Sequence, residues 1–367
     1  MSKNIEDYFV PWLKPIKMYI CEPVEVAWQD QSLHRMMTNE NPHPPSKKVM
    51  EAIVKYAQMG NRYPDQGLAV RSKIAEINGL DGPENVVLGN GSCEICDMIL
   101  RSFVQVGEEV IQHTPCFGIY QLRTNVLGGK LVSVPMIYKD QKLLFDADGI
   151  LKAITPKTKA IVVAHPNNPS GNFMDDKDIV RIAETGIPFM IDEAYIEFAG
   201  LHKSQTPLLK KYKNVLIMRT LSKAYGLAGM RFGFILAHKD VALQIAATLI
   251  PWNVGVIPMW AALAALEDQE GLQERIKFNN EQVEYIEEML GNIPGLTIFH
   301  SQANYILFDG GRTGKKGIDM VAFAQKKGLI LRPESTLYGS NGWFRVSIGT
   351  KEENRIFVEA VKEFYSK

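Results

Sequence analysis

The sequence predicts an α/β protein, with a three-layer large domain on a mostly parallel sheet and a smaller α+β domain after it. Between about residues 85 and 236, short apolar runs alternate with amphipathic stretches. Several of these runs lack the polar alternation of a half-exposed strand, which is typical of strands buried on both faces of a parallel sheet. After about residue 255 the pattern changes to a long helical stretch followed by short strand-like runs.

The expected elements follow the chain in a simple order. A helix begins near Ser46, after two prolines, and ends at Gly60. The strands of the large domain are expected at 85–88, 109–111, 130–134, 160–164, 188–191, 215–218 and 232–236. A helical stretch covers about 257–290, and the later strands are expected at 296–299, 305–308, 329–331 and 344–348.

These elements divide the chain into three parts. Residues 1–40 form an N-terminal arm that joins the small domain or reaches a partner subunit. Residues 41–254 form the large domain, and residues 255–367 form the small C-terminal domain. A chain of 367 residues is long for one hydrophobic core, which favours this division.

Composition excludes several classes of function. Lys+Arg and Asp+Glu both number 41, so no excess charge predicts binding to nucleic acid or to an anionic membrane. The N-terminus lacks a signal-peptide pattern, and no run approaches the roughly 20 apolar residues of a membrane span, so we expect a cytoplasmic protein. Cys93 and Cys96 supply two sulfurs, too few for a zinc site, so no metal is predicted. We expect these cysteines to be ordinary buried or half-buried thiols in a reducing cytosol. The alternative is that Cys93 and Cys96 form a redox-active pair.

Lys223 is the most informative residue of the chain. It lies in a loop of small residues between two apolar runs, where an unpaired ammonium would be costly to bury. Such a lysine pairs with a phosphate or forms a Schiff base with a carbonyl cofactor. Ser222 and Arg231 would suit the phosphate of that cofactor. A surface lysine in a turn is the structural alternative.

Three further polar clusters follow expected strands, where ligands bind in open α/β sheets. Ser92 lies in a glycine turn that opens a helix, whose N-terminus favours an anion, although many plain turns look alike. Asn168 lies in a proline turn and could bond a polar ring substituent. Asp192 could pair with a protonated pyridine nitrogen or cap a helix, and Tyr195 could donate to a ring oxygen.

Two residues outside these turns complete the candidate site. Phe117 could stack on a planar ring or serve as a core aromatic. Arg345 lies inside an apolar strand, where arginine usually binds a carboxylate or phosphate through two hydrogen bonds.

Taken in order, these motifs resemble the fold-type I pyridoxal-phosphate aminotransferases of class I/II, most closely the histidinol-phosphate aminotransferase branch. The resemblance covers nearly the whole chain. The set is specific for the superfamily and less specific for the substrate. The matching motifs are Asn39-Glu-Asn-Pro42, Tyr63-Pro-Asp65, Gly91-Ser-x-Glu94, Pro166-Asn-Asn-Pro-x-Gly171, Asp192-Glu-Ala-Tyr-Ile-Glu-Phe198, Arg219-Thr-Leu-Ser-Lys-Ala-Tyr-Gly-Leu-Ala-Gly229 and Phe344-Arg-Val-Ser-Ile-Gly-Thr350.

The resemblance implies a role for each candidate residue around pyridoxal phosphate. Lys223 forms the Schiff base and moves the proton at the substrate Cα, and Asp192 pairs with the pyridine nitrogen. Asn168 and Tyr195 hold the ring hydroxyl, and Phe117 packs on the ring. The cofactor phosphate is bound by Ser92, the backbone of Cys93, Ser222 and Arg231.

The resemblance also implies a homodimer and a substrate site. Tyr63 reaches the cofactor phosphate of the neighbouring subunit. Arg345 binds the substrate carboxylate or its counterpart, and Arg332 meets the distal group. The implied reaction moves an amino group from histidinol phosphate or an L-amino acid to a 2-oxo acid. A decarboxylase of a phosphorylated amino acid on the same scaffold is the alternative.

Three departures from the family pattern leave the donor open. Cys93 replaces the usual aspartate of the Gly-Ser-Asp-Glu turn, Ile16 replaces a tyrosine after Leu-Lys-Pro, and Phe117 stands where tyrosine is frequent. A catalytically silent ligand-binding protein is disfavoured because Lys223, Asp192 and Arg345 are all present. A plain nucleotide-binding protein is disfavoured because no Gly-x-Gly-x-x-Gly run occurs.

Overall fold

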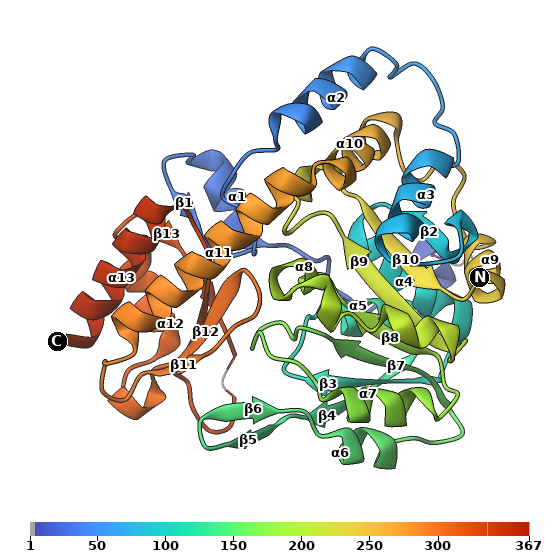
Figure 1. Ribbon diagram of the computed structural model, residues 1–367. Helices are drawn as coiled ribbons and strands as arrows, with labels where there is room; N and C mark the ends of the chain where they lie inside the picture. Colours follow the sequence, from blue (N-terminus) through green and yellow to red (C-terminus); the bar gives the residue numbers. More distant parts are fainter. Residues whose placement is uncertain (1–3, 336, 367) are drawn as a thin grey trace.

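A central sheet organises the larger part of the molecule (Figure 1). The computed structural model describes residues 4–335 and 337–366. Within these residues the sheet has seven strands in the order β2-β10-β9-β8-β7-β3-β4. Only β10 runs antiparallel to its neighbours, and the other pairs are parallel. The strands are β2 (Val86–Gly89), β3 (Glu109–Thr114), β4 (Lys130–Pro135), β7 (Thr158–Ala164), β8 (Phe189–Asp192), β9 (Val215–Thr220) and β10 (Gly233–Ala237).

Both faces of this sheet are covered, which gives the three layers. Along β7, Ile161 and Val163 enter one hydrophobic core, whereas Ala160 and Val162 enter another. The first core includes side chains of α3 (Leu68–Ile77), α6 (Ala147–Lys152), α7 (Asp176–Ala183) and α10 (Val256–Glu267). The second includes side chains of α4 (Gly91–Phe103), α5 (Ile119–Val126) and α9 (Lys239–Ala246). All seven expected strands are present, so the predicted fold class is confirmed.

The long helical stretch expected at 257–290 is two helices, α10 and α11 (Gln269–Leu290). Asp268 separates them, with φ −93° and ψ 64° outside the helical region. Its carboxylate lies 3.4 Å from the ammonium of Lys48 on α2 (Lys47–Ala57), the helix expected to begin near Ser46. The ion pair of Asp268 with Lys48 therefore lies at the break between the two helices. No proline or glycine stands at position 268 to signal this break in the sequence.

A second sheet lies beyond α11. It has the order β11-β12-β15-β14 and is antiparallel throughout. Its strands are β11 (Thr297–Phe299), β12 (Tyr305–Asp309), β14 (Arg332–Pro333) and β15 (Trp343–Ser347). Side chains of α11, α12 (Gly317–Gln325) and α13 (Lys351–Ser366) pack against it. The strand expected at 329–331 is present as β13 (Leu329–Ile330), but it lies outside this sheet and pairs in parallel with β1 (His34–Arg35).

The N-terminal segment therefore contacts both parts of the molecule. Residues 34–35 pair with β13, and the indole of Trp12 donates to the carbonyl of Val126 at the end of α5. The remaining α-helices and strands of the described residues are α1 (Glu22–Gln29), α8 (Ile196–Ala199) and the hairpin of β5 (Ile137–Lys139) and β6 (Lys142–Leu144). The exact domain bounds stay a prediction.

Among the described residues, no helix is long and apolar enough to span a bilayer. In the same part of the chain, no cluster of three or more His, Cys, Asp and Glu residues is placed to hold a metal ion.

Candidate active site

The neighbouring strands β7, β8 and β9 are parallel, so the loops after them meet at one edge of the sheet. Lys223 lies in the loop after β9. Its ammonium donates to the backbone carbonyl of Thr38 (3.0 Å) and lies over the ring of Tyr195, 5.5 Å from the ring centre. Burial, assisted by the charge of Arg345, lowers the pKa of Lys223 to about 8. The amine is therefore more readily neutral, and so more nucleophilic, than an ordinary lysine.

Asp192 ends β8 and is buried. Its two carboxylate oxygens accept hydrogen bonds from the hydroxyl of Tyr120 (2.5 Å) and the backbone N–H of Ala194 (3.0 Å). Burial raises the pKa of Asp192 to about 6, although both hydrogen bonds act in the opposite direction. A cation placed against this carboxylate would offset the cost of burying its charge.

A chain of hydrogen bonds joins the two sheets across the site. The Tyr195 hydroxyl accepts from the side-chain amides of Asn39 (3.0 Å) and Asn168 (3.3 Å). The Asn168 carbonyl accepts from the guanidinium of Arg345, which comes from β15. Arg345 also donates to the carbonyl of Met37 (3.2 Å), while its Nε has no partner among the described residues. One guanidinium donor of Arg345 is therefore buried without a hydrogen-bond partner among the described residues.

Glycines allow three elements to converge beside the start of α4. Gly91 has φ +76°, and a Cβ there would collide with the guanidinium of Arg231. A Cβ on Gly233 of β10 would come within 2.9 Å of the backbone nitrogen of Ser92. Ser222 shares a hydroxyl contact of 2.8 Å with Thr220 and is buried nearby. Backbone N–H groups of a helix start, hydroxyls and a guanidinium suit a phosphate.

Cys93 is half-buried in the first turn of α4. Burial raises the pKa of its thiol, and the positive charge of Arg231 opposes this rise. The thiol is therefore neutral at neutral pH. Compared with an aspartate at the same position, Cys93 removes one negative charge from the neighbourhood of Arg231.

Three predicted residues have their recorded side-chain contacts outside these hydrogen bonds. Phe117 is half-buried and packs edge-to-face on Tyr120, with 6.0 Å between ring centres. Tyr63 is 77% exposed and stacks on Trp252 at 4.3 Å. Arg332 is half-buried, and its guanidinium lies 3.7 Å from the sulfur of Cys21.

Sequence reasoning missed several residues that shape the site. Tyr120 and Asn39 bond Asp192 and Tyr195 directly, and Thr38 bonds Lys223. Asn39 begins the Asn-Glu-Asn-Pro motif, and Tyr120 lies three residues after Phe117, so closeness to these positions was the available signal.

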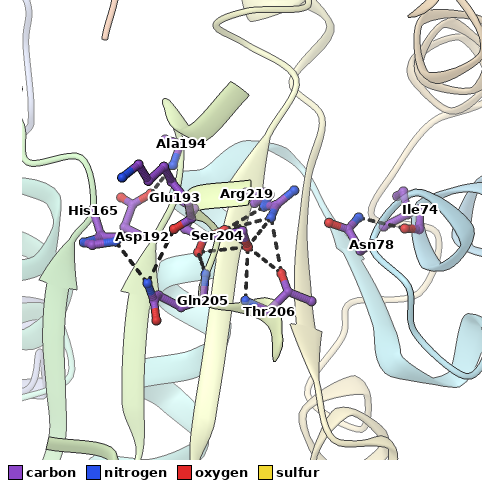
Figure 2. A network of polar contacts seen from close by, with 11 residues as sticks. Ile74, Asn78, His165, Asp192, Glu193, Ala194, Ser204, Gln205, Thr206 and Arg219 are labelled. Carbon is purple, nitrogen blue, oxygen red and sulfur yellow. Dashed lines mark hydrogen bonds and ion pairs between the residues drawn. The ribbon is translucent and has the colours of Figure 1, made fainter. Parts of the chain in front are cut away.

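A buried polar network lies beside Asp192, where Glu193 and Arg219 meet (Figure 2). Arg219 of β9 and Glu193 form an ion pair of 2.8 Å whose side chains are 2% and 0% exposed. The Ser204 hydroxyl contacts both, and Glu193 also accepts from the backbone of Gln205 (2.6 Å). Because Glu193 follows Asp192 and Arg219 lies four residues before Lys223, the pair holds two strand ends in register.

Comparison with known proteins assigns this fold and site to a class. Residues 33–361 match the family model of aminotransferases of class I and II, so the chain belongs to that family. The histidinol-phosphate aminotransferase of Methanosphaera stadtmanae is 32% identical over 95% of this chain and 94% of its own. That of Akkermansia muciniphila is 34% identical over 92% of each chain.

Solved structures agree with the sequence comparison. The histidinol-phosphate aminotransferase of Sinorhizobium meliloti, solved in complex with pyridoxal-5'-phosphate, superimposes with a TM-score of 0.86 and 25% identity. The superposition covers 98% of both chains. An L-threonine-O-3-phosphate decarboxylase from Porphyromonas gingivalis shares the fold, with a TM-score of 0.78 at 19% identity and coverage of 91% of this chain and 100% of its own.

The protein is a pyridoxal-phosphate-dependent aminotransferase. The residues of this chain fit that cofactor on three observations. Lys223 supplies a half-buried amine of lowered pKa for an aldehyde, and Asp192 supplies a buried carboxylate for a cationic ring nitrogen. The glycine-lined start of α4 with Arg231 supplies the donors that a phosphate needs.

Proposed function

We propose that the amino donor carries an anionic group, as histidinol phosphate and L-amino acids do, and that Arg345 binds this group. The observation that carries the proposal is the buried guanidinium of Arg345, which contacts Asn168 and keeps an unpartnered Nε. Arg332 lies directly opposite Arg345 across β14 and β15. A second guanidinium is thus available for the same group or for a more distant part of the donor.

The proposed roles follow from the placement of each side chain. When bound, the cofactor serves as an electron sink for the bonds at the donor's Cα. Lys223 would hold the cofactor through its aldehyde, and the amine of Lys223 would move the proton at the donor's Cα. Asp192 holds the ring nitrogen in its protonated form. Asn168 and Tyr195 donate to the ring oxygen.

The remaining proposed roles concern the phosphate and the ring face. Ser92, the Cys93 N–H, Ser222 and Arg231 bind the cofactor phosphate. Because Ser92 and Cys93 lie in the first turn of α4, the helix start adds a favourable field for this anion. Phe117 comes two residues before the start of α5, and its side chain would cover one face of the cofactor ring.

We infer a homodimer in which Tyr63 of one subunit completes the site of the other. The support is an exposed aromatic pair, because Tyr63 (77% exposed) and Trp252 (58% exposed) stack on the surface. The next residue, Asn253, donates to Glu94 of α4 (2.9 Å), so this pair adjoins the proposed phosphate turn. All four cysteines are free thiols, which favours the cytoplasm as the proposed location.

A two-substrate assay tests transamination against the decarboxylase alternative. The holoenzyme is incubated with histidinol phosphate, a single L-amino acid or a phosphorylated amino acid, each together with 2-oxoglutarate, and glutamate and carbon dioxide are both measured. We expect glutamate formation that depends on both substrates, without carbon dioxide. Release of carbon dioxide from a phosphorylated amino acid, with no use of the oxo acid, would contradict the proposal.

A further inference from the structure

Glu334 places a carboxylate among the arginines of the proposed substrate site. Arg332 and Arg345 are directly opposite in the antiparallel pair of β14 and β15, so their side chains project from the same face. Glu334 is two residues after Arg332, and strand alternation returns its side chain to that face. The contact is direct, because its carboxylate lies 3.7 Å from the Arg345 guanidinium.

The local backbone keeps Glu334 in this position. Its N–H donates to the carbonyl of Trp343 on β15 (3.3 Å), which continues the pairing beyond the end of β14. The side chains of Arg345 and Glu334 are 9% and 20% exposed. Their charges are therefore less screened than those of a surface ion pair.

The charges of this trio favour one kind of anion over another. Two guanidinium groups and one carboxylate leave a net charge of one positive unit. A donor carboxylate balances that charge, whereas a phosphate monoester, whose second pKa is about 6, brings two negative charges at pH 8. The second charge is repelled by Glu334, whose carboxylate is the negative member of the trio. Discrimination by such a repulsive element is a common source of specificity.

We propose that Glu334 is a specificity-determining residue that favours donors with a singly charged carboxylate over donors with a doubly charged phosphate. This inference rests on the proposed binding of the donor's anion by Arg345. It narrows the donor class to L-amino acids ahead of histidinol phosphate.

Three donors with the same imidazole side chain test the proposal. The donors differ in the group that Arg345 is proposed to bind. This group is a neutral alcohol in L-histidinol, a carboxylate with one negative charge in L-histidine, and a phosphate with two negative charges in L-histidinol phosphate. The values of kcat/KM are measured for the wild type, for the near-isosteric Glu334→Gln variant and for Glu359→Gln as a control. Glu359 forms a comparable pair with Arg355 (2.6 Å), but on the exposed face of α13.

The expected result is graded by charge. In Glu334→Gln, kcat/KM for L-histidinol phosphate rises by about tenfold relative to L-histidine, because each unit of donor charge gains from removal of the like charge. The value for L-histidinol stays unchanged, and Glu359→Gln leaves all three as in the wild type. An unchanged ratio between the phosphate and carboxylate donors would overturn the proposal. An equal change for all three donors would also overturn it, because it would indicate a structural effect or a contact with imidazole.

A binding measurement separates this inference from the proposed function. Acetate and methyl phosphate carry the two anions without an amino group, and their affinity for the holoenzyme is measured by calorimetry at pH 8. Glu334→Gln should strengthen methyl phosphate binding about tenfold more than acetate binding. If the donors do not react but this shift is seen, the donor assignment fails and the charge selection stands. If the shift is absent, the charge selection fails whatever the donors do.

Discussion

At the residue scale, the basicity of Asp192 is set by two opposing effects. Burial raises its pKa from 3.8 to about 6, and the hydrogen bond from Tyr120 lowers it. A buried carboxyl with a raised pKa favours the folded state at low pH, where it is protonated. The cofactor-free protein therefore loses up to about 3 kcal/mol of stability through this group as pH rises from 3.8 to above about 6.

We predict that Tyr120→Phe raises the pKa of Asp192 further, by about one unit, because a hydrogen bond to the charged form is lost. It should also lower kcat about tenfold, because a less ionised Asp192 stabilises the protonated ring nitrogen less well. Carbon-13 NMR titration of labelled aspartate in the cofactor-free protein measures the pKa. Tyr305→Phe is the matched control, since it removes another buried tyrosine bond, to the carbonyl of Asn167 (2.6 Å). A titration midpoint that moves equally in both variants would refute the role of Tyr120.

At the element scale, β8 and β9 depend on the buried pair of Arg219 and Glu193. Arg219→Met leaves the carboxylate of Glu193 buried without its cation, which should cost about 3–5 kcal/mol of unfolding free energy. The double variant Arg219→Met/Glu193→Gln should cost less than the sum of the single changes. Arg355→Met, in an exposed pair on α13, should cost under about 1 kcal/mol. Urea unfolding measures all of these.

Cofactor affinity gives a second readout of the same pair. Because Glu193 adjoins Asp192 and Arg219 lies in β9, four residues before Lys223, Arg219→Met should also weaken cofactor binding. An effect on stability no larger than that of Arg355→Met would show that the pair does not hold the strand ends.

The strands were predictable because burial on both faces leaves continuous apolar runs in the sequence, as in β7 and β9. Two features could not be predicted from the sequence: the break between α10 and α11 at Asp268, and the pairing of β13 outside the small sheet. Both depend on partners that are distant in the chain. Lys48 lies 220 residues from Asp268, and His34 pairs with Leu329. The same applies to Tyr120, which bonds an aspartate 72 residues away. The meeting of the loops after β7, β8 and β9 at one edge was predictable, because parallel neighbours end on the same side of the sheet, whereas the roles of the residues in these loops stay predictions.

At the scale of the whole molecule, the proposed dimer has shared sites, and complementation tests it. Dimers of Lys223→Ala lack the amine, and dimers of Tyr63→Ala should bind the cofactor more weakly. In a mixed dimer, one site has Lys223 together with the partner's Tyr63. At limiting cofactor, a coexpressed equal mixture should recover up to about a quarter of wild-type activity, given a twofold-symmetric dimer. No recovery, in a preparation shown to contain mixed dimers, would mean that Tyr63 does not act across the interface.

The central claim is that Lys223 and the bound cofactor accept an amino group from a small donor. The most direct test mixes the loaded enzyme with L-histidine or histidinol phosphate in the absence of any oxo acid and follows the cofactor absorbance. The account predicts conversion of the cofactor to its amine form with stoichiometric release of the oxo product. In Lys223→Ala the conversion should be slower by about a thousandfold or more, while Lys213→Ala, on the surface, should match the wild type. Conversion in Lys223→Ala at the wild-type rate, or none in the wild type with any donor, would contradict the account.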